Sequence, residues 1–200
     1  MKALKILAID PGFASLGWAV VSFTSDGPVC EAAGVFRTKP DRTKLKYNDN
    51  VDRARRLYDH LSSTADDHDI RIIAAEAQSW TRFSNADRSI ATVFGLLAAL
   101  GVETSAPIVQ LSPQDVKLRV CGKKTASKED IKQAVYQIAS GSREFIEGIR
   151  ASTQREHAAD AVAVALAAFQ APIVYGIASV LGLTTCTERY LSTSSKPFSI

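Results

Sequence analysis

Short apolar runs separated by turn residues make up the N-terminal part of the chain. They span residues 5–10, 16–23 and 32–38, and the first ends at Asp10, which a proline and a glycine follow. Short runs bounded by Gly-containing turns are typical of buried strands, and their close spacing favours antiparallel pairing of neighbours. The pattern therefore predicts an antiparallel meander of three strands.

Helical and strand patterns alternate in the rest of the chain. Residues 48–67 show helical spacing, with apolar positions on one face: Val51, Ala54, Leu57, Tyr58 and Leu61. Strand patterns follow at 70–76 and 108–111, and helical patterns at 85–100, 127–139, 157–170 and 174–183. This order predicts an α/β fold with a five-stranded mixed sheet, three antiparallel strands followed by alternating helices and strands, flanked by helices. No linker divides the chain, so we expect one domain over residues 1–190 and a loose tail at 191–200.

Composition and charge are those of an ordinary globular protein. Of the 200 residues, 46% are hydrophobic and 22% charged, and the net charge of +3 permits an anionic partner without requiring one. Three cysteines form no CxxC pair, which indicates reduced thiols in a cytosol-like compartment. No secretory signal is visible. Pro172 interrupts a charge-free stretch from Ala161 to Thr187, so we expect two packed helices there and no membrane span.

Polar groups with metal-binding chemistry stand at the ends of apolar elements. Asp10 ends the first predicted strand and Glu76 the fourth, while His157 and Asp160 lie three residues apart on one face of an apolar helix. Glu156 points about 100° away from His157 and is expected to face solvent. Taken singly, Asp10 is also explained as a turn residue and Glu76 as a strand end facing water. Together the four groups predict a site for Mg²⁺ or Mn²⁺, because buried carboxylates that converge need a cation.

Four ordered motifs carry a resemblance to a known family. They are ILAIDPGFASLGWAVV, IIAAEAQ, DVKLRVCGKKTASKEDI and HAADAVAVALAA. Over residues 4–170 the chain resembles the RuvC family of Holliday-junction resolvases, which have the RNase H-like fold. The resemblance implies that Asp10, Glu76 and Asp160 are catalytic acids. It places His157 where many members have Asp and some have His.

The resemblance also implies a mechanism and its cofactors. Two Mg²⁺ or Mn²⁺ ions would support in-line hydrolysis of a phosphodiester, with Asp10 bridging them and Glu76 and Asp160 flanking it. Lys117 and Lys128 match the family's lysine-bearing segment and would neutralise phosphate charge near the cut. Their plainer interpretation is as solvated surface lysines.

Two departures from the family pattern concern DNA contacts. The second glycine of the family's Gly-x-Gly is lost at Gly122-Lys123-Lys124, which adds positive charge. The family's aromatic that inserts at the junction has no fixed counterpart, since both Trp80 and Phe83, with Arg82 between them, follow Glu76 at a different spacing. Phe83 is equally explained as a packing residue. We expect Trp80, Arg82, Phe83, Lys123 and Lys124 among the DNA-binding residues.

Basic residues are concentrated in two segments. Residues 37–56 contain eight basic side chains against three acids, and residues 117–132 contain six against two. Such clusters favour contact with a nucleic-acid backbone, and they predict Arg53 and Arg56 as DNA contacts. A charge run of this kind is also typical of a solvated face.

A four-way junction has two symmetric strands to cut, so a twofold homodimer is expected. The resemblance places its contact on the helix at 85–101, whose apolar residues are Ile90, Val93, Phe94, Leu97 and Leu100. Simple core packing explains those residues equally well. A branch-migration motor is a further possible partner, and no membrane is expected.

Several functions remain compatible with the sequence. The first is a metal-dependent, structure-selective endonuclease for Holliday junctions, acting in the cytoplasm of a bacterium or, if virus-encoded, of its host. A nuclease for flaps or RNA–DNA hybrids would keep the same fold. A junction-binding protein that does not cut is disfavoured because all acidic positions are filled. An actin-like sugar kinase or ATPase is disfavoured because 200 residues do not accommodate its two lobes.

Overall fold

A single mixed sheet organises the protein. The structure, a computed structural model, describes residues 2–77 and 85–183. The strands are β1 (Leu4–Asp10), β2 (Ser15–Thr24), β3 (Gly27–Arg37), β4 (Ile72–Glu76) and β5 (Ile108–Leu111), in the order β3-β2-β1-β4-β5. β1, β2 and β3 pair antiparallel, whereas β4 pairs parallel with β1 and β5. The predicted five-stranded mixed sheet, with its meander first, is confirmed.

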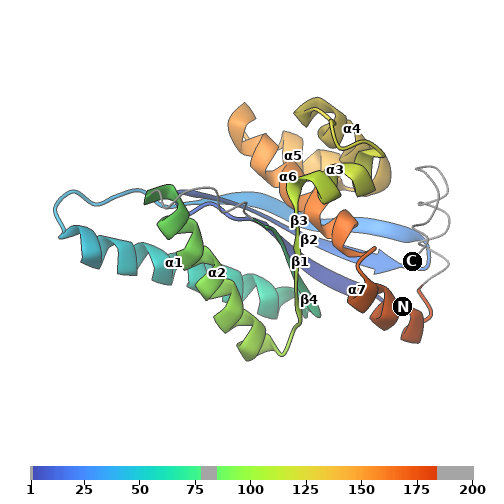
Figure 1. Ribbon diagram of the computed structural model, residues 1–200, viewed down its shortest axis with the longest axis horizontal. Coiled ribbons are helices and arrows are strands. Elements are labelled where there is room, and N and C mark those ends of the chain that lie inside the picture. The colour runs from blue at the N-terminus through green and yellow to red at the C-terminus, as the bar shows by residue number, and fades with distance from the viewer. Residues whose placement is uncertain (1, 78–84, 184–200) are drawn as a thin grey trace.

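Helices cover both faces of this sheet (Figure 1). On one face lie α1 (Lys46–His68) and α2 (Asn85–Thr104). The other face carries the remaining helices: α3 (Pro113–Cys121), α4 (Lys128–Ile138), α5 (Ser142–Glu147), α6 (Ser152–Ala168) and α7 (Pro172–Val180). α3 and α5 were not predicted as helices, because each is short and neither has a clear apolar period.

The alternation of side chains along each strand separates two cores. In β1, Leu4, Ile6 and Ala8 join the core under α3–α7, while Leu7 and Ile9 join the core under α1 and α2. Successive side chains of a strand point to opposite faces. The next residue, Asp10, therefore points toward the α6 side. The same alternation in β4, where Ala74 faces α6 and Ala75 faces α1, directs Glu76 to that side as well.

α6 is the central helix of the protein and begins earlier than predicted. It starts at Ser152 rather than at His157, so His157 and Asp160 lie in its second and third turns and not at its mouth. Its first residues, STQRE, are polar and show no apolar period, which hid the true start. Every residue from Ala158 to Ala168 is buried, as expected for a helix that is apolar all round.

Other boundaries differ from the predictions for local reasons. β3 begins at Gly27 instead of residue 32, because its tight hairpin with β2 pairs Thr24 with Gly27. Val51, predicted on the buried face of α1, is 67% exposed. Most buried residues of α1 are four positions apart: Asp49, Arg53, Leu57, Leu61 and Ala65, with Thr64 beside the last of them. The predicted tail at 191–200 lies outside the described residues.

Membrane-spanning length was tested on the described part of the chain. No single helix there is long and apolar enough to cross a bilayer. α6 and α7 reach the required length and composition only when taken together, and the chain bends by 68° between them.

Candidate active site

Two carboxylates meet at the ends of adjacent parallel strands. β1 pairs with β4 in the register Ile9–Ala75, so Asp10 and Glu76 follow as neighbours at the same edge of the sheet. Both point toward α6, and both are only partly exposed. Carboxyl ends of parallel strands are common places for ligand chemistry, since loops open there over the sheet edge.

α6 brings two further polar groups to this edge. The Nδ1 atom of His157 lies 2.6 Å from Oδ2 of Asp10. Asp160, one turn further, is 8% exposed. Glu156 is exposed, as its helical position predicted. The structure thus brings all four predicted groups to one edge of the sheet: Asp10, Glu76, His157 and Asp160.

Lys128 holds the buried carboxylate of Asp160 through an ion pair. Lys128 is the first residue of α4, and a capping box fixes this helix start: Ser127 and Asp130 exchange side-chain and backbone hydrogen bonds. Asp130 also pairs with Lys123 at 2.9 Å. The cap therefore aims one lysine at the carboxylates and keeps a second one beside the helix start.

Burial, and then the neighbouring carboxylates, determine the electrostatics of the site. Burial and the nearby charges of Asp10 and Asp160 raise the pKa of Glu76 to about 7, although Lys128 and Lys117 oppose this. Burial also raises the pKa of Asp160, against the stabilising charge of Lys128. Carboxylates that repel one another in this way favour the arrival of a cation.

The two basic partners respond in the opposite sense. The hydrogen bond with Asp10 raises the pKa of His157 and outweighs burial, which lowers it. Burial likewise lowers the pKa of Lys128, but its pairing with Asp160 dominates and the net shift is upward. Both groups therefore carry positive charge more readily than free side chains, and they partly neutralise the acids.

The donor set fits a hard divalent cation in its chemistry. Asp10, Glu76 and Asp160 offer the oxygen ligands that Mg²⁺ and Mn²⁺ prefer, and His157 offers a nitrogen that Mn²⁺ accepts more readily. As the side chains stand in residues 2–77 and 85–183, no three Asp, Glu, His or Cys groups close around one metal position. Lys128 pairs with Oδ2 of Asp160 and His157 with Oδ2 of Asp10, so both carboxylates already have a positively charged or hydrogen-bonding neighbour.

Known proteins are similar to this chain over most of its length. The family described as "Crossover junction endodeoxyribonuclease RuvC" matches residues 6–168. The chain belongs to the RuvC family. A RuvC from Natranaerobius thermophilus is 28% identical over 166 residues, which cover 83% of this chain and 94% of that protein. A RuvC from Gloeobacter violaceus is 30% identical over 168 residues, covering 83% and 88%.

A solved structure shares the fold. The RuvC of T. thermophilus, in complex with a Holliday junction substrate, superposes with a TM-score of 0.67 at 22% identity. The match covers 82% of this chain and 92% of that one. The RNase H-like class predicted for the sheet and its helices is thereby confirmed for this RuvC-family chain.

The remaining predicted contacts lie in several places. Lys117 is half-buried on α3 and contributes to the field at Glu76. Lys123 and Lys124 are exposed in the turn between α3 and α4. Trp80, Arg82 and Phe83 lie outside the described residues. Of the predicted lysines, Lys117 and Lys128 thus lie near the carboxylates.

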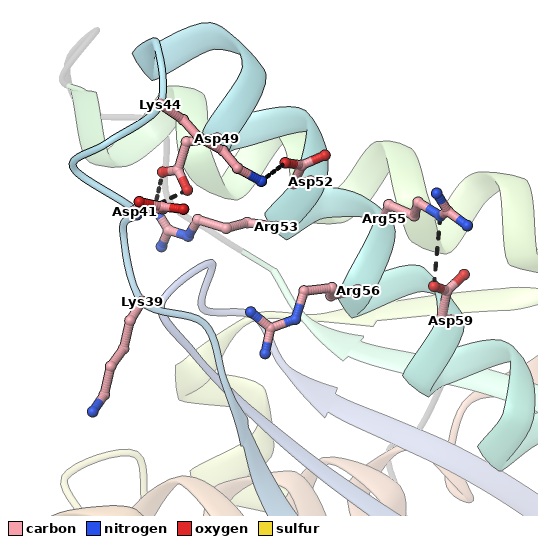
Figure 2. Close-up of a pocket in the computed structure, with 9 residues that line it drawn as sticks. All are labelled: Lys39, Asp41, Lys44, Asp49, Asp52, Arg53, Arg55, Arg56 and Asp59. Carbon is pink, nitrogen blue, oxygen red and sulfur yellow. Dashed lines mark hydrogen bonds and ion pairs between the residues drawn. The ribbon is translucent and has the colours of Figure 1, made fainter.

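The basic segment at 37–56 surrounds an open hollow beside α1 (Figure 2). Its volume is about 380 Å³. The side chains that line it are Lys39, Asp41, Lys44, Asp49, Asp52, Arg53, Arg55, Arg56 and Asp59. Acidic neighbours pair with two of the exposed cations: Lys44 with Asp52 at 2.5 Å and Arg55 with Asp59 at 3.8 Å.

The prediction that Arg53 contacts DNA is corrected by its burial. Arg53 is 8% exposed, and its guanidinium lies 4.5 Å from the centre of the Phe13 ring. Arg56, three residues on, is exposed. Lys39 and Arg56 extend toward the open part of the hollow, and within the described residues no ion pair joins either to a carboxylate. The pattern of charge along the sequence could not separate these three cations.

Gly17 is a site residue that the sequence analysis missed. It pairs with Asp10 across β1 and β2. A Cβ atom at this position would stand 2.4 Å from the carbonyl oxygen of His157 and 3.1 Å from Cβ of Asp10. The absence of a side chain here is what lets the second turn of α6 approach the sheet. The glycine of the Gly-Trp motif was its only signal.

Gly17→Ala should therefore slow cleavage, by about 100-fold, because even a shift of about 1 Å at a catalytic group is costly. Single-turnover cleavage of a saturated four-way junction would measure it. Gly176→Ala is the matched control, since a Cβ there meets nothing within 4 Å and α7 lies outside the family match. Wild-type cutting by Gly17→Ala would show that α6 tolerates displacement.

Proposed function

We propose that the chain resolves four-way DNA junctions by metal-dependent hydrolysis of phosphodiester bonds. It is a crossover junction endodeoxyribonuclease of the RuvC family, and relatives over its whole matched length carry that name. One observation carries the proposal. Asp10 and Glu76 end adjacent parallel strands, and α6 presents His157 and Asp160 to the same edge.

We assign the metal-binding role to Asp10, Glu76 and Asp160, with His157 beside them, and infer two Mg²⁺ or Mn²⁺ ions. Bound divalent cations at this edge supply an activated water and stabilise the leaving oxygen. His157 must be neutral to coordinate, and its hydrogen bond with Asp10 favours the protonated form. We therefore expect the acidic side of the pH profile to include the loss of this proton.

Lys128 has two successive roles in this proposal. Without a cation, its ammonium neutralises Asp160. With a cation held by Asp160, the ammonium of Lys128 would be placed to contact a phosphate oxygen of the substrate. Lys117 supports the same charge balance from α3, where it acts on Glu76. Charge that is aimed at the reacting phosphate lowers the barrier more than it improves ground-state binding.

We further propose a homodimer, through a face of α2 that differs from the predicted one. Of the five apolar residues predicted for this contact, Val93, Leu97 and Leu100 have no exposed surface, whereas Ile90 and Phe94 are partly exposed. The opposite face exposes small or apolar side chains at helical spacing, namely Ala91, Gly95, Ala98, Ala99 and Val102. Val102 is 82% exposed. Two copies of such a face can pack closely about a twofold axis, which would present two cutting sites to one junction.

The proposed DNA path includes the hollow beside α1. Because Lys39 and Arg56 lack acidic partners there, they are the cations best suited to a backbone phosphate. We infer that the protein acts in the cytoplasm of a bacterium or of a virus-infected host, where its substrate is found. A branch-migration motor remains a proposed partner on the strength of the family alone.

Arg56→Ala should lower the slope of log affinity against log salt by about 0.9, the value for one neutralised phosphate. Arg71→Ala is the control: Arg71 is exposed, precedes β4, and so lies at the end of the sheet away from Glu76. Its slope should match that of the wild type. Fluorescence anisotropy with a labelled junction over a range of salt concentrations measures both. Equal slopes for all three proteins would mean that Arg56 contacts no phosphate and that the hollow is an ordinary solvated surface.

A cleavage assay on four substrates tests the function itself. Four-way junction, flap, RNA–DNA hybrid and linear duplex are compared under single-turnover conditions with Mg²⁺ and with Mn²⁺. The proposal expects symmetric cuts in the junction and little cutting of the other three. Preferred cutting of a flap or hybrid would identify a different nuclease on the same fold, and binding without cutting would identify a junction-binding protein.

A further inference from the structure

A buried arginine on α1 links the outer helix to the loop that follows Asp10. Arg53 Nε donates a hydrogen bond of 3.0 Å to Oγ1 of Thr38, and Arg53 Nη1 lies 3.9 Å from Asp49 on the preceding turn. All three residues are buried, with exposed fractions of 8% or less. Neither the carboxylate site nor a solvated DNA-contact surface requires a cation in this position.

Thr38 also contacts the loop at residues 11–14. Its hydroxyl donates to the carbonyl of Phe13 at 2.6 Å, and its backbone N–H donates to the carbonyl of Ala14 at 3.1 Å. The Phe13 ring lies beneath the Arg53 guanidinium, a cation–π contact of 4.5 Å. Arg53, Thr38 and Phe13 therefore form one connected cluster, which we call the loop clamp.

The loop clamp holds the segment at which the hydrogen-bonded pairing of the strands has ended. Pairing of β1 with β2 ends at Asp10 and Gly17, and pairing of β2 with β3 ends at Ser15 and Arg37. Thr38 is the next residue after β3 and holds the loop from that side. The loop is also compact, since a Cβ on Gly12 would stand 2.1 Å from the carbonyl oxygen of Ser15.

The two sides of the sheet meet at this loop. Phe13 packs in the core under α1 and α2, whereas Asp10 turns to the opposite side and meets His157. Phe13 is three residues after Asp10, so a displacement of Phe13 would be transmitted along this short backbone segment to the Asp10 carboxylate. Groups that orient a metal ligand commonly change metal affinity or activity by about 10- to 100-fold when they are removed.

We propose that Arg53 is a positioning residue for Asp10 and acts through Thr38 and the loop at residues 11–14. It makes no contact with DNA in this role. The inference rests on the proposed function, because it assumes that Asp10 is a metal ligand. Its effect is on metal affinity and on the rate of cutting, with little change in junction affinity.

Two pairs of variants test this proposal. Thr38→Val removes both side-chain hydrogen bonds at constant shape, and Thr38→Ser keeps the hydroxyl. Arg53→Met keeps much of the packing and loses the charge, and Arg71→Met is the exposed control. The Thr38 pair leaves the Asp49–Arg53 contact in place, so it remains informative if Arg53→Met does not fold.

Three measurements apply to each variant. The first is the Mg²⁺ or Mn²⁺ concentration that gives half-maximal single-turnover cutting. The second is junction affinity in metal-free buffer, together with its salt slope. The third is the amide hydrogen-exchange rate of residues 12–14 in the metal-free protein, which needs no activity.

We expect Thr38→Val and Arg53→Met to raise the half-saturating metal concentration about tenfold and to speed exchange in the loop. Junction affinity should stay within about threefold and the salt slope should not change. Thr38→Ser and Arg71→Met should behave as the wild type does.

An unchanged metal requirement for Thr38→Val would overturn the proposal. So would a reduced salt slope for Arg53→Met with normal metal dependence, since that result identifies a phosphate contact. Asp10→Asn, measured in parallel, separates this failure from that of the proposed function. If Asp10→Asn cuts normally, the assignment of Asp10 to the metal site fails. If Asp10→Asn is inactive but the clamp variants keep the wild-type metal requirement, the inference alone fails.

Discussion

Asp10→Asn should bind a four-way junction about as tightly as the wild type and cut it at least about 1,000-fold more slowly. The amide keeps the shape of the side chain but removes the charge that attracts a cation. A metal that stabilises charge in the transition state contributes several kcal/mol, and about 4 kcal/mol corresponds to that rate. The variant also removes the carboxylate that faces Nδ1 of His157.

Single-turnover cutting at saturating protein and at several metal concentrations would measure this loss. Glu156→Gln is a matched control, because Glu156 precedes His157 on α6 but is exposed to solvent. The control should cut at the wild-type rate. If Asp10→Asn cut as fast as the control at every metal concentration, Asp10 would be a turn residue and the site assignment would be wrong.

Glu76→Gln should abolish cutting and at the same time stabilise the metal-free protein. Its pKa rises from 4.5 to about 7 in the folded chain, chiefly through burial and then through Asp10 and Asp160. Between these values the folded protein binds more protons than the unfolded chain, so stability falls as pH rises. Above pH 7 the full cost of the buried charge remains, and glutamine does not carry it.

The expected gain for Glu76→Gln at pH 8 is about 1–2 kcal/mol, reduced from the full shift because the group is partly solvated. For a chain of this size it corresponds to about 2–8 °C in Tm. Near pH 4 the carboxyl is protonated in both states, and the gain should vanish. Thermal unfolding in a chelator at the two pH values measures the difference. A loss of stability at pH 8 would mean that Glu76 is held by a partner rather than strained by its neighbours.

The carboxylate site could be inferred from sequence because local patterns determine most of it. Strand ends follow from where an apolar run stops, and a shared helical face follows from a spacing of three residues. Both are short-range properties, so the sequence alone predicts that Asp10, Glu76, His157 and Asp160 form one site. The start of α6 was misplaced because its polar first turn has no period to read.

Burial was harder to infer, because it depends on contacts between distant parts of the chain. Arg53 lies in a run of basic residues, yet it shares a four-residue spacing with Leu57 and Leu61. That four-residue spacing indicated the burial of Arg53, but the many basic residues around it favoured an exposed position. On α2 the large apolar residues face the core, and only the packing of α1 and β5 against this helix reveals which side is left exposed.

Because α6 is rich in alanine, substitutions far from the charged groups are expected to affect the site. Of the residues from Ala158 to Ala168, seven are alanine, and all eleven are buried. Small side chains let the helix lie close over the sheet. A bulkier residue near the C-terminal end of α6 would tilt the whole helix and so displace His157 and Asp160. A genetic screen for loss of junction cutting should therefore find substitutions along the whole of α6, and most of those positions need not contact DNA.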